Sequence, residues 1–203
     1  MDLKTTILEN SLELFLQRGC KAVTMDDVAR ENGISKRTLY EHFTDKYDLL
    51  EQCIGYLHCH MMQYAGKMEE ESVDILDLLF KLHDTQSDVI INLKRNFFQE
   101  LKRYYFPLYK KTYEKFMEYH EKKIKDYLTK GQREGYVKED INKDLISKII
   151  IEISNMIENS EIFTSKEHSR KELFKDVIIT YFRGISTMKG IETIDNYFDK
   201  TNK

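Results

Sequence analysis

Apolar residues recur at steps of three and four along most of the chain, a spacing that predicts amphipathic helices. The first predicted helix covers residues 3–18, with Ile7, Leu12 and Phe15 on its apolar side and Gly19 at its end. The same periodicity predicts helices at about 25–32, 36–43, 45–67, 73–82, 87–105, 107–133, 143–159 and 167–188. A single proline and eight glycines agree with long helices and few loops. The predicted fold is therefore all-α, with about nine helices.

Several predicted helix ends carry a residue that caps or breaks a helix. Ser72 is predicted to cap the helix that follows the run of glutamates at 69–71. Pro107, the only proline, fits the first turn of a helix, where its missing N–H has no partner to lose. Gly131 and Gly135 are predicted to lie in the loop before Asn142, which caps the helix from residue 143.

Residues 24–43 predict two short helices joined by a tight corner. Thr24 and Asp27 have the spacing at which each side chain satisfies a free backbone N–H of the first helix. Gly33 enters a left-handed conformation without steric cost, so the first helix ends there. Ser35 is the N-cap of the second helix. With residues 3–18 these helices form a three-helix unit, and its predicted core contains Phe15, Val28, Leu39 and Phe43.

The second of these short helices has a polar outer side. Leu39 and Phe43 lie on one face, which leaves four other side chains pointing outward. These are Lys36, Arg37, Thr38 and Tyr40. Basic, hydroxyl and aromatic groups at the exposed N-terminal end of a short helix suit insertion into the major groove of DNA. The pattern therefore predicts a helix-turn-helix that reads DNA.

This stretch, together with residues 6–19 and 44–50, resembles the TetR family of transcriptional regulators. The matching blocks are the amphipathic opening that ends at Gly19, Thr24–Ala29, Gly33–Tyr40, Glu41–Phe43 and Asp45–Leu50. Together they cover roughly the first quarter of the chain, as expected of one small module ahead of a larger domain. The resemblance implies a DNA-binding domain at 1–50, a linking helix at about 45–67, and a helical ligand-binding and dimerisation domain at 51–203.

The resemblance also implies which side chains contact DNA. Four residues match positions that hold the phosphate backbone, namely Thr24, Tyr40, His42 and Lys46. The groove-reading surface is matched by Lys36, Arg37 and Thr38, and we count the N-cap Ser35 among the DNA-binding residues as well. Arginine can bridge guanine O6 and N7, and hydroxyl and ammonium groups donate to phosphates. The alternatives are that Thr24 and Ser35 act only as caps and that His42 packs inside the unit.

The charge of the chain gives this interpretation little help. The formal net charge is −3, and residues 1–50 contain seven Lys and Arg against nine Asp and Glu. The electrostatic argument for DNA binding therefore depends on a local cluster of Lys36, Arg37 and Lys46. An acidic remainder also limits non-specific binding, which is dominated by the neutralisation of phosphates.

The last two predicted long helices have unusually wide apolar faces. At 100° per residue, the apolar positions of 143–159 span about 140° and those of 167–188 about 180°, whereas a surface helix needs about 100° to face its own core. The excess predicts a second partner, and two helices from each of two chains form a four-helix interface. The resembling family dimerises in this way; the alternative is a helix pair buried in a monomer. The predicted interface residues are Ile146, Ile150, Ile153, Ile157, Phe174, Ile178, Tyr181, Phe182 and Ile185.

An aromatic stripe in the middle of the chain has two interpretations. At helical spacing such a stripe is usually plain core, but hydroxyl and imidazole groups need partners when they are buried. Aromatic walls with a few polar tips are also typical of a small-molecule pocket, and members of the resembling family commonly hold an inducer in this domain. The candidate pocket residues are Phe97, Leu101, Tyr104, Tyr109, Tyr113, Phe116 and His120.

Other candidate sites are weaker. Cys53, His58, Cys59 and His60 lie close in sequence, but their spacing is not that of a zinc site, and we predict no metal and no cofactor. Residues 102–133 contain ten Lys and Arg against four Asp and Glu, which we interpret as a solvated face with an anionic ligand as the alternative. Nothing resembles a nucleophile triad, a phosphate-binding glycine loop or a pair of catalytic carboxylates.

The sequence therefore predicts a transcriptional regulator and not an enzyme. Three cysteines cannot all pair, and there is no signal-peptide pattern and no apolar run of the roughly 18 residues that a membrane span needs, so we expect a cytoplasmic protein. We expect a homodimeric repressor that binds a pseudo-palindromic DNA operator and is released by a small-molecule inducer. The alternative is a helical ligand-binding or scaffold dimer whose helix-turn-helix no longer binds DNA.

Overall fold

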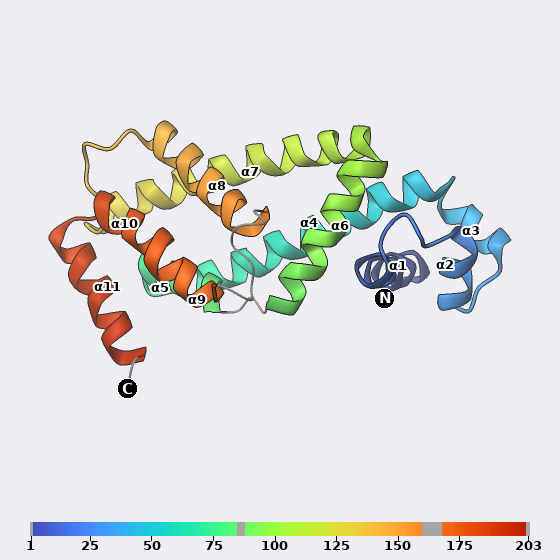
Figure 1. Ribbon diagram of the computed structural model, residues 1–203, viewed down its shortest axis with the longest axis horizontal. Helices are drawn as coiled ribbons and strands as arrows, with labels where there is room; N and C mark the ends of the chain where they lie inside the picture. Colours follow the sequence, from blue (N-terminus) through green and yellow to red (C-terminus); the bar gives the residue numbers. More distant parts are fainter. Residues whose placement is uncertain (1, 85–87, 160–167, 202–203) are drawn as a thin grey trace. The chain divides into compact units, whose positions relative to one another are not determined.

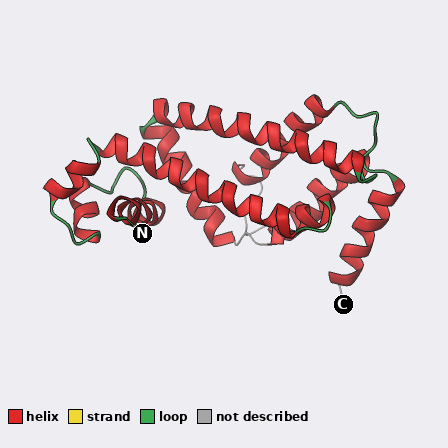
Figure 2. Ribbon diagram, turned by 180° about the vertical axis from the view of Figure 1, so that it is seen from behind, coloured by secondary structure: helices red, strands yellow, loops and turns green. Residues whose placement is uncertain are grey.

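The computed structural model describes residues 2–84, 88–159 and 168–201. Every named element in these ranges is a helix, as Figure 2 shows by colour. The described residues form no strand, and one isolated antiparallel bridge joins Val137 and Ser186. The predicted all-α fold is therefore confirmed.

The chain divides into two compact units. Unit 1 contains Met1–Ala65 and Val89–Phe116, and unit 2 contains Gly66–Asp88 and Met117–Lys203. Two long helices, α4 (Lys46–Glu71) and α7 (Phe106–Arg133), contribute many residues to both units. This division follows packing, and the predicted functional boundary at residue 50 stays a prediction.

Unit 1 contains the N-terminal helices (Figure 1). Besides parts of α4 and α7 they are α1 (Leu3–Arg18), α2 (Met25–Glu31), α3 (Lys36–His42) and α6 (Asp88–Tyr104). One apolar cluster joins them, with Ile7, Leu49 and Leu50 fully buried beside residues from every other helix of the unit. The cluster contains Phe15, Val28, Leu39 and Phe43, so the predicted core of the three-helix unit is confirmed.

The turn between α1 and α2 is held by the far end of α6. Gly19 ends α1 with φ +83°, in the left-handed region that favours glycine. The Glu100 carboxylate accepts the backbone N–H of Lys21 at 3.0 Å, and a Cβ at Gly19 would lie 2.6 Å from both Glu100 carboxylate oxygens. Burial and the neighbouring Glu100 charge raise the pKa of the Cys20 thiol to about 12. A contact 79 residues distant in sequence thus fixes the entry to the helix-turn-helix.

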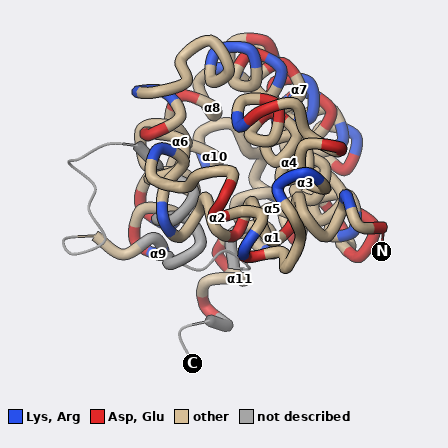
Figure 3. Tube along the Cα trace, turned by 90° about the vertical axis from the view of Figure 1, so that its right-hand side faces the viewer, with Lys and Arg blue, Asp and Glu red and all other residues tan. Residues whose placement is uncertain are grey.

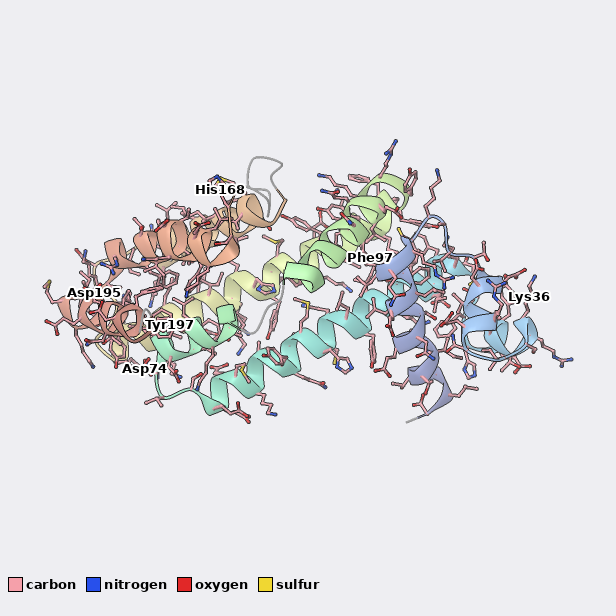
Figure 4. All side chains as sticks on the ribbon, turned by 60° about the horizontal axis from the view of Figure 1, so that its bottom comes forward. Lys36, Asp74, Phe97, His168, Asp195 and Tyr197 are labelled. Atoms are coloured by element: carbon pink, nitrogen blue, oxygen red, sulfur yellow. The ribbon has the colours of Figure 1, made fainter. Side chains whose placement is uncertain are left out.

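Unit 2 contains the C-terminal helices. Besides parts of α4 and α7 they are α5 (Ile75–Asp84), α8 (Lys143–Asn159), α9 (Arg170–Leu173), the π-helical segment Phe174–Ile179, α10 (Thr180–Ile185) and α11 (Met188–Thr201). One apolar cluster joins α5, the π-helical segment and α11, where Phe80 and Tyr197 stack at 3.7 Å between ring centroids. Figure 4 labels Tyr197 on α11 beside this cluster. A second cluster joins α7, α8 and α10 through Leu128, Ile150 and Ile185.

The connection between α4 and α5 differs from the prediction. The helix predicted to end near residue 67 continues to Glu71 and includes the run of glutamates, of which Glu69 lies 3.1 Å from the Lys123 ammonium. The prediction that Ser72 caps the next helix is wrong, because its hydroxyl donates to the Met68 carbonyl at 2.6 Å. Asp74 is the cap, and its carboxylate accepts the backbone N–H groups of Leu76 and Asp77 at 2.9 Å.

Gly131 does not lie in a loop as predicted. It lies in the last turns of α7, where a Cβ would meet the Val137 side chain at 2.6 Å. Gly135 does form the predicted turn, with φ +76°. Asn142 caps α8 as predicted, since its side-chain oxygen accepts the Leu145 N–H at 3.0 Å. The close packing of Val137, and not a turn, therefore accounts for the first glycine.

The last predicted helix, at 167–188, is followed by a helix that was not predicted. The described part of the helix predicted at 167–188 begins at Arg170 and ends at Ile185, and α11 starts at Met188; residue 167 lies outside the described residues. The break is fixed by two backbone hydrogen bonds, from Thr187 N–H to the Tyr136 carbonyl and from Lys138 N–H to the Ile185 carbonyl, both at 2.9 Å. If α9, the π-helical segment and α10 are counted as one helix, the described residues form one helix more than predicted.

None of the helices, over the residues that the structure describes, is both long and apolar enough to cross a bilayer.

Candidate nucleic-acid interface

The first helix of the helix-turn-helix begins with the predicted capping pair. The Thr24 hydroxyl accepts the Asp27 N–H at 3.1 Å, and the Asp27 carboxylate accepts the Thr24 N–H at 2.9 Å. These hydrogen bonds from Thr24, together with the adjacent Arg30, lower the pKa of Asp27 below its usual value. Gly33 follows with φ +62°, which turns the chain at the end of α2. The predicted start and corner of the motif are thus confirmed.

The second helix, α3, is capped by Ser35 as predicted. Its hydroxyl accepts the Thr38 N–H at 3.0 Å, and the two hydroxyl oxygens are 2.9 Å apart. Leu39 is completely buried, and Lys36, Arg37 and Tyr40 are exposed, while Thr38 is half-buried. Figure 4 shows Lys36 at the outer side of the helix, and Figure 3 shows basic residues in blue along the start of α3. Ser35 thus works as a cap, and its neighbours present the polar side chains.

The two cations of α3 have carboxylate partners within the unit. The Lys36 ammonium lies 2.5 Å from Asp26 of α2, and this hydrogen bond raises the pKa of Lys36. The Arg37 guanidinium lies 3.5 Å from Glu41, one turn further along α3, and its side chain is 91% exposed. Exposed pairs of this kind contribute little to stability, so a phosphate or a base can replace either carboxylate at small cost.

Lys46 and His42 lie at the end of the motif and the start of α4. The Lys46 ammonium donates to the Lys21 carbonyl at 3.1 Å and lies 5.8 Å from the centroid of the Tyr105 ring. Asp45 is the cap of α4, because its carboxylate accepts the Asp48 N–H at 2.8 Å. His42 is half-buried, with its ring centroid 6.3 Å from that of Phe43. The Lys46 ammonium therefore stands over the turn between α1 and α2, which was not expected from its place in the sequence.

The candidate pocket residues lie on α6 and α7. Phe97 and Leu101 of α6 are buried in the apolar cluster of unit 1. On α7, Tyr109 and Tyr113 stack with ring centroids 5.4 Å apart, and Phe116 lies 5.2 Å from His58. Further along this helix, His120 packs edge-on against Tyr119 at 5.7 Å between centroids. The exposed Tyr104 lies at the end of α6. The role of these side chains as a pocket stays a prediction.

The cysteines and histidines of α4 do not converge. Cys53 is buried, and its thiol lies 3.7 Å from the Leu8 carbonyl, whereas Cys59 is exposed. His60 packs against Tyr56 with 4.3 Å between ring centroids. Across the described residues, no three His, Cys, Asp or Glu side chains are placed to hold a metal ion.

The predicted dimer residues differ in burial within one chain. Four of them pack inside unit 2, namely Ile150, Ile157, Phe174 and Ile185. The other five are half-buried, namely Ile146, Ile153, Ile178, Tyr181 and Phe182. The most exposed apolar side chains of α8 are two that were not among the predicted interface residues, Leu145 and Met156, at 55% and 45% exposure. They lie at one edge of the apolar arc of this helix, about 120–140° around the axis from Ile150, as the period of 3.6 residues requires.

The helix-turn-helix is similar to that of known regulators. Residues 7–53 match the family model described as bacterial regulatory proteins, tetR family. The biofilm operon icaADBC HTH-type negative transcriptional regulator IcaR of Staphylococcus aureus (strain Newman) is 35% identical over 78 residues, which are 36% of this chain and 41% of IcaR. The chain thus spans less than half the length of that relative. The uncharacterized HTH-type transcriptional regulator YvaF of Bacillus subtilis (strain 168) is 24% identical over 89% of this chain and 94% of YvaF.

Solved structures share the fold over nearly the whole chain. A putative transcriptional regulator from Saccharomonospora viridis, in complex with choline, has a TM-score of 0.76 at 17% identity and covers 91% of this chain and 97% of its own. A TetR-family transcriptional regulator from Marinobacter aquaeolei VT8 has a TM-score of 0.70 at 22% identity, with 98% of both chains covered. At these identities the likeness concerns the fold alone. The N-terminal motif and the C-terminal helices therefore belong to one recurring architecture.

Proposed function

We propose that the chain is a member of the TetR family of bacterial transcriptional regulators and that it is a homodimeric repressor, which binds a pseudo-palindromic operator and is released by a small molecule. One observation carries the DNA-binding part: a capped α3 presents Lys36, Arg37 and Tyr40 to solvent above a buried Leu39. The description of IcaR as a negative regulator supports repression over activation.

The proposed reading of DNA assigns different tasks to different side chains. The exposed Arg37 guanidinium has the planar fork that bridges guanine O6 and N7, and Lys36 and Thr38 lie beside it on α3. Thr24, Tyr40, His42 and Lys46 would donate to phosphates, which positions the helix but reads no sequence. Ser35 would contribute indirectly, because its hydroxyl caps α3 and holds the first turn of that helix in place.

The proposed dimer rests on the apolar face of α8 that unit 2 leaves uncovered. Leu145 and Met156 are separated by about three turns and lie about 20° apart around the helix axis. Ile150 and Ile157 lie about 100–140° further around the axis and are buried in their own chain. A second copy of α8 is the partner that would cover the open face, as in a four-helix interface. The helix-turn-helix units of the two chains, which we call the reading heads, must then match successive major grooves, about 34–36 Å apart.

The proposed release uses α4 as the mechanical link. This helix starts beside the helix-turn-helix at Lys46, and its later residues belong to unit 2. The aromatic stripe of α7 offers rings and polar tips to a ligand, and its phenols include Tyr109 and Tyr113. The regulator from Saccharomonospora viridis has a choline complex, which supports a small-molecule site in this architecture. A ligand that shifts α4 would change the separation of the two heads.

The second candidate is a helical scaffold dimer whose helix-turn-helix no longer binds DNA. The observation in its favour is that both cations of α3 have carboxylate partners, Asp26 and Glu41, in a head with more acidic than basic residues. A measurement of DNA binding separates the two candidates, because a scaffold would bind no duplex in a salt-dependent way.

DNA reading is tested by titrating the chain and two variants with duplexes that carry the intergenic region beside its own gene. The unmodified chain should bind with an affinity that falls steeply with salt. Lys46→Ala should weaken matched and mismatched sites alike and reduce the salt slope by about 1. Arg37→Ala should weaken the matched site by about 1–3 kcal/mol and leave mismatched sites nearly unchanged.

The control for these variants is Lys67→Ala, an exposed lysine of unit 2 that pairs with Glu71 on the same helix. It should leave affinity and salt slope unchanged. Equal losses on matched and mismatched sites for Arg37→Ala would refute the base-reading role. Undetectable or salt-independent binding by the unmodified chain would favour the scaffold.

Release is tested with the compound that the protein carries through purification. Mass spectrometry of the native dimer should detect a small molecule, and the same compound added in excess should weaken operator binding at least about tenfold. Tyr113→Phe keeps the ring and removes one phenol, so it should reduce sensitivity to the compound while DNA affinity without ligand stays the same. A ligand-saturated dimer that held its operator as tightly as the free dimer would disprove this mechanism.

A further inference from the structure

A group of exposed cations and aromatic rings lies where α6 ends, against the turn between α1 and α2. The Lys21 ammonium lies 4.5 Å from the centroid of the Tyr104 ring, and the Arg103 guanidinium lies 5.3 Å from the same centroid. The Lys102 ammonium lies 5.7 Å from the ring of Tyr109 at the start of α7. We name these five residues the basic-aromatic corner. All belong to unit 1, the unit that contains the helix-turn-helix.

The cations of the corner differ from their neighbours on α7 in having no carboxylate partner among the described residues. Lys111 lies 2.5 Å from Glu51, and Lys110 lies 3.9 Å from Glu114. No such ion pair involves Lys21, Lys102 or Arg103 in the ranges that the structure describes. All three side chains are exposed. The corner therefore carries three uncompensated positive charges in a chain whose net charge is negative.

One acidic residue is close to the corner, and its carboxylate already has a structural role. Glu100 is half-buried, and it accepts the backbone N–H of Lys21 at 3.0 Å. This bond holds the turn of the main chain and leaves the Lys21 ammonium over the Tyr104 ring. The rings themselves restrict the cations, because a cation above an aromatic face loses part of its rotational freedom before any ligand arrives. The corner is thus both charged and ordered.

The corner is continuous with the proposed phosphate contacts of the helix-turn-helix. Lys46, one of those contacts, donates to the Lys21 carbonyl at 3.1 Å and lies 5.8 Å from the ring of Tyr105, the residue after the corner. Lys21 in turn stands three residues before Thr24, another proposed phosphate contact. A duplex that meets Lys46 and Thr24 has its backbone next to Lys21.

We propose that the basic-aromatic corner binds phosphates of the duplex that flanks each half-site, so that the chain contacts more DNA than its helix-turn-helix covers. The inference rests on the proposed function and extends the same interface. Arg103 and Lys102 supply charge, and the exposed phenol of Tyr104 is a hydroxyl donor to a phosphate oxygen. The contact reads no sequence. It adds affinity that depends on duplex length and on salt.

Two duplexes and two double variants test the proposal. The operator is first isolated from a random-sequence library with the full chain, then prepared with its half-sites only and with about one helical turn of arbitrary sequence added on each side. The unmodified chain should bind the longer duplex about tenfold more tightly at low salt, with a slope steeper by about 0.9 for each added phosphate contact. The double variant Lys102→Gln, Arg103→Gln should bind both duplexes equally.

The matched control is the double variant Lys67→Gln, Lys122→Gln, which removes the same charge from exposed lysines of unit 2. It should keep the full advantage of the longer duplex. If both variants unfold at the same midpoint temperature as the unmodified chain, their folds are intact. Selection of no operator at all would contradict the proposed function and, with it, this extension.

Three results would overturn the inference while the proposed function stands. The first is equal affinity of the unmodified chain for the two duplexes. The second is an equal loss on both duplexes in the Lys102, Arg103 variant, which would place the effect inside the half-site. The third is binding of the chain to vesicles of phosphatidylglycerol, lost in that variant, with no effect of duplex length, which would assign the corner to an anionic membrane.

Discussion

The double variant Leu145→Glu, Met156→Glu is expected to be a monomer with at least about a hundredfold weaker operator binding. Both side chains are about half exposed on one face of α8, which is turned away from Ile150 and Ile157, the residues that pack into their own chain. In the proposed dimer each glutamate would be buried against its symmetry mate without a partner, which is strongly unfavourable. The heads would then bind their half-sites separately, without the gain in effective concentration that a dimer supplies.

Sedimentation equilibrium and operator titration measure the two effects. The control is Met188→Glu, which places the same charge at a methionine that is 71% exposed at the start of α11, outside the proposed interface. That variant should remain a dimer with unchanged affinity. If the Leu145, Met156 variant sedimented as a dimer, the exposed face of α8 would not be the interface.

Phe15→Ala is expected to lower the free energy of unfolding by about 3–5 kcal/mol. Phe15 is completely buried in the cluster of unit 1, where residues of α1, α2, α3, α4 and α6 meet. Removal of the ring leaves a cavity that helices fixed at several points cannot close. Since the same cluster supports Leu39 beneath the reading surface of α3, operator binding should weaken as well.

Urea unfolding followed by circular dichroism measures this change. Leu16→Ala is the comparison, because Leu16 is the next residue of α1 and only half-buried against the same cluster. It should cost less than half as much free energy as the loss of the phenylalanine ring. Similar midpoints for Phe15→Ala and the unmodified chain would contradict the central place of this ring in the core.

The helix-turn-helix could be predicted because its determinants are local. Thr24 and Asp27 form their reciprocal hydrogen bonds across three residues, and the Ser35 cap spans three as well. The positive φ of its own backbone is enough to explain why glycine occupies position 33. Periodicity within single helices also located the core, because the residues facing it recur at fixed steps.

Two of the predictions that were wrong concern positions decided by contacts outside the helix itself. Gly131 is required by the approach of Val137 after a turn, and not by a loop of its own. The helix break before α11 depends on hydrogen bonds between Thr187 and Tyr136 and between Lys138 and Ile185. Local preference cannot indicate such contacts, since each partner alone is compatible with a helix.

The same limit applies to the candidate site. The exposed cations of α3 followed from the period of the helix, but the partner of Lys36 is Asp26 on the other helix of the motif. The basic-aromatic corner needed α6 to be placed beside the turn that contains Lys21, which is about eighty residues earlier. In the sequence the residues from 102 onward showed only an excess of positive charge.

The contact between Gly19 and Glu100 has a consequence for how this chain can evolve. Glycine at position 19 is required by φ +83° and again by the carboxylate that occupies the space of a Cβ. A shorter side chain at position 100 would free that space but would give up the acceptor for the Lys21 N–H. A substitution at either position alone is therefore expected to destabilise this turn. Among descendants of this sequence, the two residues should be inherited as a pair, although one follows the end of α1, the other lies in α6, and neither is proposed to touch DNA.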